Sequence, residues 1–302
     1  MKARKYNYVC VMGGIGDQIF QFSFANYLRA KLNCKIYLDI CYYKSKSNYN
    51  QYKFLLNKAA AKKNFRIVRK TSFLDYKFLS YLRIFDIFKI DKVFKKIYNY
   101  FFKTEIKKFI YDYWEKNKEI NIKYNSFYFG YWHKIKFVKE TKDHLNKFFI
   151  NEILKKKKIK NFIEKKINSK TVAIHIRGGD FAQYKTHNLL SENYYDNAIK
   201  HITKKIIKPN FHVFTNDINF AYSLLKKYSS KYKILYIKQF NFRDEEEFSL
   251  FSTYKLAIIA NSTFSYMSSY LSNTRKISFA PKKWLLGKKL DKNKIFKGLY
   301  FI

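Results

Sequence analysis

The segment Thr171-Val172-Ala173-Ile174-His175-Ile176-Arg177-Gly178-Gly179-Asp180 is an apolar strand that ends abruptly in polar residues. It opens a regular alternation of short apolar runs with segments of helical periodicity. The expected strands cover residues 171–176, 211–215, 233–237, 256–260 and 276–280, the last of the sheet, and the expected helices cover 192–204, 218–228, 245–254 and 262–271. Repeated β-α units of this size predict a doubly wound parallel sheet, whose ligands bind at the carboxyl ends of the strands.

The start of the chain has the pattern of a second β-α-β unit. Its expected elements are a strand over 6–12, a glycine turn over 13–16, a helix over 17–31, a strand over 35–40 and a strand-like segment over 126–131 that ends the first sheet. Between about 50 and 124, lysines interleave with Phe, Tyr, Ile and Leu, which predicts mostly amphipathic helices. Residues 141–170 look like a solvated helical connector with four consecutive lysines at its centre.

These patterns predict an α/β chain of two domains. The N-terminal domain, over 1–150, is Rossmann-like and carries the helical insert over about 50–124. A basic helical connector over 151–170 leads to a C-terminal Rossmann-like domain over 171–302.

The composition narrows the class of protein. The 302 residues include 62 Lys and Arg against 22 Asp and Glu, a net charge of +40 that suits nucleic acid, a membrane surface or an acidic substrate. Aromatic residues make up 21% of the chain, which excludes intrinsic disorder. Three cysteines, no uninterrupted apolar segment near the N-terminus and no apolar run of transmembrane length lead us to expect a cytoplasmic protein.

The turn Gly13-Gly14-Ile15-Gly16 lies between an expected strand and helix, where backbone N–H groups and the helix dipole can meet an anion or a sugar. As a dinucleotide fingerprint it is incomplete, because Ile19 stands where the third glycine belongs, although Asp39 lies at the expected distance. Nicotinamide or flavin binding and a purely structural βα turn are the alternatives.

Arg177 follows the strand over 171–176 and would lie at the ligand-binding edge of the sheet. Its guanidinium can neutralise a pyrophosphate bidentately, and His175 shares its face of the strand. The alternative is a structural ion pair between Arg177 and Asp180. Asp217 follows the next strand. It either supports Arg177 or caps the following helix, and N-capping is the default interpretation.

The segment Asn261-Ser262-Thr263-Phe264-Ser265 is a hydroxyl-rich turn before a helix, which suits phosphate binding; ordinary N-capping by Ser262 or Thr263 is the alternative. The sequence has no Asp-x-Asp, Walker loop, His-Glu-x-x-His or Gly-x-Ser-x-Gly motif. Cationic side chains are therefore expected to neutralise any bound phosphate.

In this order the motifs resemble the bacterial α-1,2-fucosyltransferases of glycosyltransferase family 11. The matching blocks cover nearly the whole chain and are Gly13-Gly14-Ile15-Gly16-Asp17-Gln18-Ile19-Phe20-Gln21-Phe22, Gly130-Tyr131-Trp132, His175-Ile176-Arg177-Gly178-Gly179-Asp180-Phe181, Leu190-Ser191-x-x-Tyr194-Tyr195, Phe214-Thr215-Asn216-Asp217, Ile258-Ile259-Ala260-Asn261-Ser262-Thr263-Phe264-Ser265 and Ala280-Pro281-Lys282-Lys283-Trp284.

The resemblance implies a GT-B-like fold, in which two Rossmann-like domains face a cleft. It implies inverting, metal-independent transfer of L-fucose from GDP-fucose to galactose O2, with no cofactor. The insert over about 50–124 would lie on the acceptor side, and the C-terminal domain would bind GDP-fucose. The acceptor would be a galactose-terminated oligosaccharide or a lipid-linked glycan.

The resemblance also implies site residues. Arg177 would bind the pyrophosphate and act in catalysis, with Asp217 supporting it, and Glu247 would meet the guanine. The full set of donor-binding residues is Gly14, Gly16, Gln18, His175, Arg177, Asp180, Asp217, Glu247, Ser262, Thr263, Phe264 and Ser265.

The chain departs from the family pattern at two positions. Where the family has a second Arg, this chain has Gly178, so the donor would be held by one fewer cation unless a nearby Lys substitutes. Asp17 replaces the Asn that usually precedes Gln18, and a carboxylate there is a candidate catalytic base that deprotonates the acceptor hydroxyl.

Three alternatives remain open. A fucosyltransferase of other linkage, or a transferase of another GDP-sugar, would use the same scaffold. A basic nucleic-acid-binding protein fits the lysine and aromatic content, but the chain has no RNP1 pattern, zinc finger or arginine-rich arm, so no nucleic-acid partner is expected. A dinucleotide oxidoreductase is the third. The default explanation of the high positive charge is a compositional bias toward Lys. The functional alternative is that the lysines attach the protein peripherally to the anionic inner face of the cytoplasmic membrane.

Overall fold

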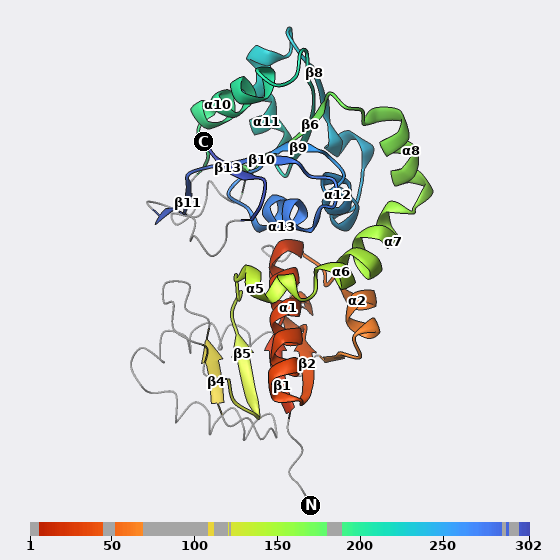
Figure 1. Cartoon of the computed structure of the whole chain (residues 1–302), viewed down its shortest axis with the longest axis vertical. Helices are drawn as coiled ribbons and strands as arrows, with labels where there is room; N and C mark the ends of the chain where they lie inside the picture. The colour runs from red at the N-terminus through yellow and green to blue at the C-terminus, as the bar shows by residue number, and fades with distance from the viewer. Residues whose placement is uncertain are drawn as a thin grey trace, which may run out of the picture. The chain divides into compact units, whose positions relative to one another are not determined.

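The computed structural model describes residues 6–44, 52–68, 108–111, 120, 122–179, 189–285, 288–289 and 296–302. The chain divides into two compact units, 1–149 and 150–302, and each is built around its own parallel sheet (Figure 1). The predicted α/β fold of two Rossmann-like domains is confirmed, and this is the domain content of a GT-B protein. Asp180 and most of the predicted insert over 50–124 lie outside the described residues.

The sheet of the first unit has the strand order β3-β2-β1-β5-β4, with every pair parallel. Its strands are β1 (Tyr6–Cys10), β2 (Lys35–Asp39), β3 (Arg66–Val68), β4 (Lys108–Tyr111) and β5 (Ser126–Phe129). The expected last strand, β5, lies inside the sheet between β1 and β4. The direction of chain progression reverses between β1 and β5, which is the topological switch point of this sheet.

The pattern over 50–124 does not reveal β3 and β4, which extend the sheet at its two edges. Both strands are only three or four residues long, too short to show a period of two against the surrounding lysines. The helix described in this region is the short α2 (Asn57–Lys62). The prediction of mostly helices is therefore wrong for the residues of β3 and β4.

A long buried helix covers the first sheet. α1 (Ile15–Leu32) packs against β1, β2 and α5 (Ile135–Lys139), and the short helices η1 (Cys41–Lys44) and α6 (Lys142–Leu145) complete the described part of the unit. The ring of Phe24 stacks on Trp132 with 4.0 Å between centroids. Because Trp132 follows β5, this stack fixes the loop after β5 against α1.

The sheet of the second unit has the order β13-β10-β9-β6-β7-β8, again parallel throughout. Its strands are β6 (Thr171–Ile176), β7 (Asn210–Thr215), β8 (Lys233–Tyr236), β9 (Leu256–Ile258), β10 (Ile277–Ala280) and β13 (Leu299–Phe301), and its helices include α10 (Glu192–Thr203), α11 (Ile218–Leu225), α12 (Asp244–Phe251) and α13 (Thr263–Leu271). Short 3-10 helices, η3 (Lys226–Tyr228) and η4 (Ile237–Phe240), follow α11 and β8, and β11 (Lys283–Leu285) pairs antiparallel with β12 (Lys288–Lys289).

The expected elements of this unit agree with the structure to within a few residues, with one exception. The strand over 276–280 is not the last, because β13 pairs with β10 and forms the edge of the sheet. Its three residues are too few for a periodic signal.

The predicted connector belongs to the second unit rather than standing apart in solvent. Its helices α7 (Asn151–Leu154) and α8 (Lys157–Lys166) lie in the second unit, while the π-helical turn η2 (Asn146–Ile150) before them lies mostly in the first. Ile159 and Phe162, three residues apart on α8, are buried, and the Phe162 ring meets Phe240 edge-on at 4.9 Å. The lysines of α8 conceal this apolar face in the sequence.

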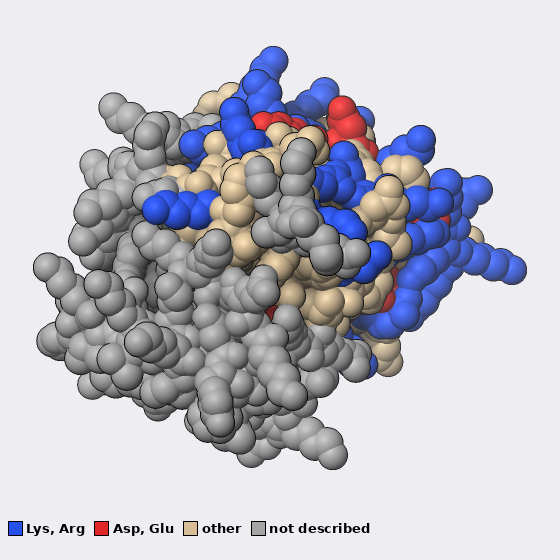
Figure 2. All heavy atoms as spheres, turned by 90° about the horizontal axis from the view of Figure 1, so that it is seen from below, with Lys and Arg blue, Asp and Glu red and all other residues tan. Residues whose placement is uncertain are grey.

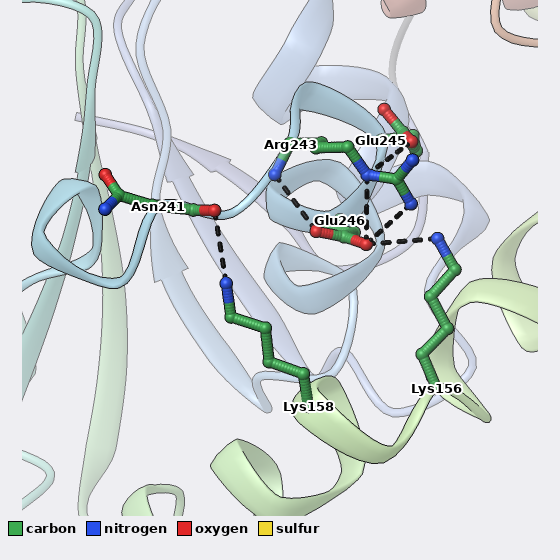
Figure 3. Close-up of polar contacts among 6 residues, drawn as sticks. All are labelled: Lys156, Lys158, Asn241, Arg243, Glu245 and Glu246. Atoms are coloured by element: carbon green, nitrogen blue, oxygen red, sulfur yellow. Dashed lines mark hydrogen bonds and ion pairs between the residues drawn. The ribbon is translucent and has the colours of Figure 1, made fainter.

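Charged contacts fix the start of α8 to α12 (Figure 3). Lys156 Nζ lies 3.0 Å from a carboxylate oxygen of Glu246, which also binds the guanidinium of Arg243, and Lys158 donates to the Asn241 carbonyl. Burial alone would raise the pKa of Glu246, but hydrogen bonds from Arg243 and Lys156 lower it to about 2. The carboxylate therefore stays ionised and joins the two helices across the pH range of interest.

Candidate functional site

The switch point of the second sheet brings three of the sequence motifs together. β6 lies between β7 and β9, so the polar segments that follow these three strands all start at the same edge of the sheet. These segments begin at Arg177, at Asn216 and after Ala260. The crevice beside a switch point is where doubly wound sheets bind their ligands.

A set of hydrogen bonds fixes the loop after β6 to the loop after β7. The Gly178 N–H donates to Asn216 Oδ1 at 3.0 Å, and Asn216 Nδ2 donates back to the Gly178 carbonyl at 3.2 Å. The Gly179 N–H donates to Asp217 Oδ2 at 3.1 Å, while Oδ1 of the same carboxylate accepts from the Phe220 N–H. Asp217 is thus the N-cap of α11, as the default reading held, and it also holds the glycine loop.

The packing around Gly178 explains one departure from the family pattern. A Cβ atom at this position would lie 2.9 Å from Asp217 Cβ and 2.9 Å from Phe220 Cδ1, closer than real carbon atoms approach. Glycine therefore fits where a second arginine would not, because Asp217 and Phe220 fill the space.

His175 is a buried, neutral link between β6 and α13. Its Nδ1 lies 2.8 Å from Ser265 Oγ, and its ring packs against Phe251 and Phe264. Burial, helped by the charge of Arg177, lowers the pKa of His175 to about 3. The imidazole therefore anchors the first turn of α13 and carries no charge at neutral pH.

The N-terminus of α13 lies beside this link. Ser262 is the N-cap residue of α13, and its Oγ accepts a hydrogen bond from the Phe264 N–H at 3.4 Å. The predicted N-capping by Ser262 is therefore confirmed. Thr263 and Phe264 are half-buried in the first turn. The positive end of the helix dipole and the half-buried Arg177, which follows β6, are two features suited to a phosphate.

Glu247 lies in the first turn of α12, among four consecutive acidic residues. Burial raises the pKa of Glu247 to about 7, against the lowering effect of Lys238 and with a smaller raising effect from Asp244. A carboxyl group that titrates near neutral pH is typical of a functional site. Its role in guanine binding stays a prediction.

In the first unit, the switch point lies between β1 and β5, and the glycine turn follows β1. Gln18 is buried there and acts within the protein: its Nε2 donates to the carbonyls of Gly13 and Lys53, and its Oε1 accepts from the Leu55 N–H. The amide thus fixes the segment after residue 52 to the turn. Gly14, whose Cβ position faces the ring of Tyr52 at 3.4 Å, is the N-cap of α1.

Asp17, in the first turn of α1, is paired with a residue that the sequence motifs did not include. His133 Nε2 lies 2.9 Å from Asp17 Oδ1. A signal was available, because His133 follows directly after the block Gly130-Tyr131-Trp132. Histidine next to a motif is too common to be singled out without the topology that brings β5 beside β1.

Two buried polar groups beside the turn were also missed. Gln21 accepts from the Met12 N–H and donates to the Gly130 carbonyl, so it joins the ends of β1 and β5. The hydroxyl of Tyr43 donates to the Gly13 carbonyl at 3.1 Å, and burial raises the pKa of Tyr43. Both groups fix the turn that carries Asp17.

Comparison with known proteins identifies the family. The family model of Glycosyl transferase family 11 matches residues 7–300, so the chain belongs to this family. The O-antigen biosynthesis glycosyltransferase WbnK of Escherichia coli is 28% identical to it, over 94% of this chain and 97% of that protein. An alpha-1,2-colitosyltransferase of Escherichia coli is 26% identical, over 92% of each chain.

The chain is also similar to solved structures of fucosyltransferases. POFUT1 in complex with GDP matches with a TM-score of 0.45 and 13% identity, over 91% of this chain and 97% of that one. Fucosyltransferase NodZ from Bradyrhizobium matches with a TM-score of 0.45 and 10% identity, over 89% and 94%.

Proposed function

We propose that this member of glycosyltransferase family 11 transfers L-fucose from GDP-fucose to O2 of a terminal galactose in a glycan acceptor. The observation that carries the proposal is the convergence, at the switch point of the second sheet, of Arg177, the fixed glycine loop and the N-terminus of α13. Such a set of groups suits a nucleoside diphosphate. The resemblance of the motifs to α-1,2-fucosyltransferases supplies the donor sugar and the linkage.

In this proposal the second unit stabilises the leaving group. Charge develops on the GDP oxygen as its bond to the fucose carbon breaks, and the guanidinium of Arg177 neutralises it. A preorganised group of this kind contributes ~3 to 4 kcal/mol, by analogy with an oxyanion donor. The proposal needs no metal ion, because cationic side chains and backbone N–H groups bind the phosphates.

The reaction is then a single displacement with inversion. The acceptor oxygen bonds to the fucose carbon while the bond from that carbon to the diphosphate breaks. Asp17 in the first unit takes the hydroxyl proton. The carboxylate lies in the first turn of α1, within reach of the glycine turn at the switch point of the first sheet.

The direct test is to incubate the protein with GDP-fucose and a panel of galactosides and to assign the product linkage by NMR. A fucose on galactose O2 supports the proposal. Another linkage would retain the transferase and reject its regiochemistry. Thermal stabilisation by GDP, without stabilisation by NAD or by RNA at moderate salt, supports the nucleotide-sugar reading over the oxidoreductase and nucleic-acid alternatives.

A second donor is favoured by one specific finding. A relative that is 26% identical over 92% of this chain is an alpha-1,2-colitosyltransferase. Colitose differs from fucose by the absence of the C3 hydroxyl, so both GDP-sugars present the same diphosphate to Arg177. Parallel assays with GDP-fucose and GDP-colitose decide which sugar is transferred: a higher kcat/KM with GDP-colitose would replace fucose in the proposal.

For location we propose peripheral attachment to an anionic membrane surface. Lysines 155, 157, 158, 160, 165, 166 and 170, on and around α8, are all exposed. Figure 2 shows blue side chains gathered along the right-hand edge, the side on which α8 lies in Figure 1. Among the described residues, no helix is long and apolar enough to cross a bilayer.

The apolar side of α8 is already buried, so binding would depend on charge, with each lysine adding ~1 kcal/mol near an anionic surface. Co-sedimentation with anionic liposomes at low salt, lost at high salt, is the expected result. If the protein stays in the supernatant at low salt, membrane attachment is rejected and compositional bias explains the positive charge.

A further inference from the structure

Asp17 and His133 bridge the switch point of the first sheet. Asp17 comes from the first turn of α1, which follows β1, and His133 comes from the loop after β5; β1 and β5 are neighbours in the sheet. Their side chains meet at the carboxyl edge, where Nε2 lies 2.9 Å from Oδ1. This is the edge of a doubly wound sheet at which ligands bind.

The chemistry of the two groups gives the direction of the hydrogen bond between them. An ionised carboxylate only accepts, so the His133 Nε2–H donates to Asp17 Oδ1. The His133 side chain is 10% exposed and that of Asp17 is 18% exposed, and Nδ1 of His133 is buried. With Nε2 engaged and Nδ1 buried, the imidazole presents no ring nitrogen to solvent, whereas the carboxylate has further lone pairs for a substrate hydroxyl.

The surrounding backbone is shaped to hold this pair. A Cβ atom on Gly13 would lie 2.7 Å from Asp17 Oδ2, so glycine is required for the carboxylate to lie where it does, and Gly13 also has a positive φ of 78°. Trp132 has a φ of 55°, a left-handed conformation that costs free energy in a non-glycine residue. Its stack on Phe24 holds it there, and His133 is the next residue.

Two aromatic rings fix the plane of the imidazole. The ring of Phe20, one turn along α1 from Asp17, lies 4.7 Å from the His133 ring, and Tyr131 stacks on it at 5.3 Å with an interplanar angle of 24°. Tyr131 itself is 38% exposed. A ring fixed in this way delivers its N–H to Asp17 with little loss of side-chain entropy on forming the bond.

We infer that His133 is a positioning residue for the proposed transfer: it holds the Asp17 carboxylate in the orientation in which it accepts the proton of the acceptor hydroxyl. The O–H bond of the acceptor breaks as its oxygen bonds to the sugar carbon. The electron pair of the sugar–phosphate bond leaves with GDP, and the proton goes to Asp17. The inference rests on the proposed function and adds a residue to it.

The experiment compares three variants by steady-state kinetics with donor and acceptor. His133→Gln keeps an N–H near the position of Nε2 and should retain kcat within about threefold, while His133→Phe keeps a packed ring without the donor and should lower kcat about tenfold or more. The KM for the donor should stay unchanged in both. The matched control is His144→Phe, because His144 also lies in the first unit, stacks on Phe22 and donates through Nε2 to the Ala59 carbonyl.

Equal losses of kcat in His133→Gln and His133→Phe, or a wild-type kcat in His133→Phe, would overturn the inference alone. A wild-type protein that turns over no GDP-sugar would instead overturn the proposed function, and the inference with it. Thermal unfolding of each variant separates a folding defect from a kinetic one. If His133→Phe does not fold, the comparison of His133→Gln with His133→Asn, whose amide cannot reach the position of Nε2, decides the same question: equal kcat values in these two contradict the role.

Discussion

Both units of this protein are built on a parallel sheet with a switch point beside its first strand, but they differ in strand order and in the chemistry at that point. In the second unit the switch point between β6 and β9 presents Arg177, a glycine loop and a helix N-terminus. In the first unit the switch point between β1 and β5 presents the carboxylate of Asp17 paired with His133. The two switch points thus carry different groups, which we propose to be an anion site in the second unit and a proton acceptor in the first.

This difference shows that the fold determines where a site lies, whereas the residues of the loops determine its chemistry. The two units also fix their loops differently. Backbone N–H groups of the second unit are held by side chains of the next strand's loop, Asn216 and Asp217. In the first unit, Gln18 and Gln21 use both ends of their amides for the same purpose.

The largest expected effect is on the second unit. Arg177→Ala should lower turnover of GDP-fucose about a hundredfold or more, because the leaving diphosphate loses its main neutralising charge. The measurement is kcat with saturating donor. Arg243→Ala is the control, since Arg243 is an arginine of the same unit that binds Glu245 and Glu246. Near-normal turnover in Arg177→Ala would remove Arg177 from the site.

The next effect falls on the first unit. Asp17→Asn should lower kcat about ten- to a hundredfold, since an amide cannot accept the hydroxyl proton. Asp143→Asn, on α6 of the same unit, should leave kcat unchanged. An Asp17→Asn protein with full activity would show that the transfer needs no base at this position and that the two switch points do not divide the chemistry as proposed.

A stability experiment compares glycines of the two units. Gly178→Ala should destabilise the protein by about 1 to 3 kcal/mol, because its Cβ would overlap Asp217 and Phe220. Gly14→Ala is the matched change in the first unit, where the Cβ would meet Tyr52 at an ordinary 3.4 Å and should cost less. The measurement is the free energy of unfolding by denaturant. Equal effects would show that the two loops are equally tolerant.

The pH dependence of donor binding tests Glu247. Its pKa, raised by burial to about 7, lies above the ordinary value, so the carboxyl is mostly neutral below pH 7 and ionised above it. An ionised carboxylate accepts the N–H groups of guanine, so the affinity for GDP-fucose should rise about tenfold from pH 6 to pH 8. GDP-fucose has no phosphate that titrates in this range. The Glu247→Gln protein should bind GDP-fucose with the same affinity at both pH values. If its affinity changed with pH as that of the wild type does, the pH dependence would belong to another group.

The same shift has the opposite sign for stability. A raised pKa means that the neutral carboxyl stabilises the fold fully below about pH 4.5, and that this stabilisation is lost as the pH rises through about 7. Glu247→Gln should therefore remove part of the loss of stability between pH 5 and pH 8. Chemical unfolding of both proteins at the two pH values measures this, and identical profiles would contradict the assigned burial of Glu247.

The smallest expected effect is that of a chelator. Turnover of GDP-fucose should be the same with and without excess EDTA, because Arg177 and backbone groups are proposed to neutralise the diphosphate. Activity that is lost with EDTA and restored by a divalent cation would contradict metal-independent transfer.

The sequence predicts the second unit better than the first for a physical reason. Strands such as β6 and β7 are buried on both faces, so their apolar runs stand out, and their carboxyl ends are marked by His175, Arg177 and Asp217. β3, β4 and β13 are edge strands of three or four residues without such a signal. The lysines of α8 likewise conceal the buried pair Ile159 and Phe162.

The candidate site divides in the same way. Arg177, directly after β6, and Asp17, in the first turn of α1, can be predicted from the motifs that contain them. The residues that contact them cannot be predicted in this way. His133, which pairs with Asp17, lies 116 residues further along the chain. Asp217, which fills the space that a side chain at position 178 would need, lies 39 residues after Gly178. Such pairs depend on strand order, which local patterns do not contain.

The central claim is that the second unit binds the nucleotide and the first supplies the proton acceptor. Calorimetric titration of GDP into wild type, Arg177→Ala and Asp17→Asn tests it most directly. The account predicts that Arg177→Ala binds GDP at least tenfold more weakly, while Asp17→Asn binds it as wild type does. GDP binding that is unchanged in Arg177→Ala, or weakened as much in Asp17→Asn, would contradict it.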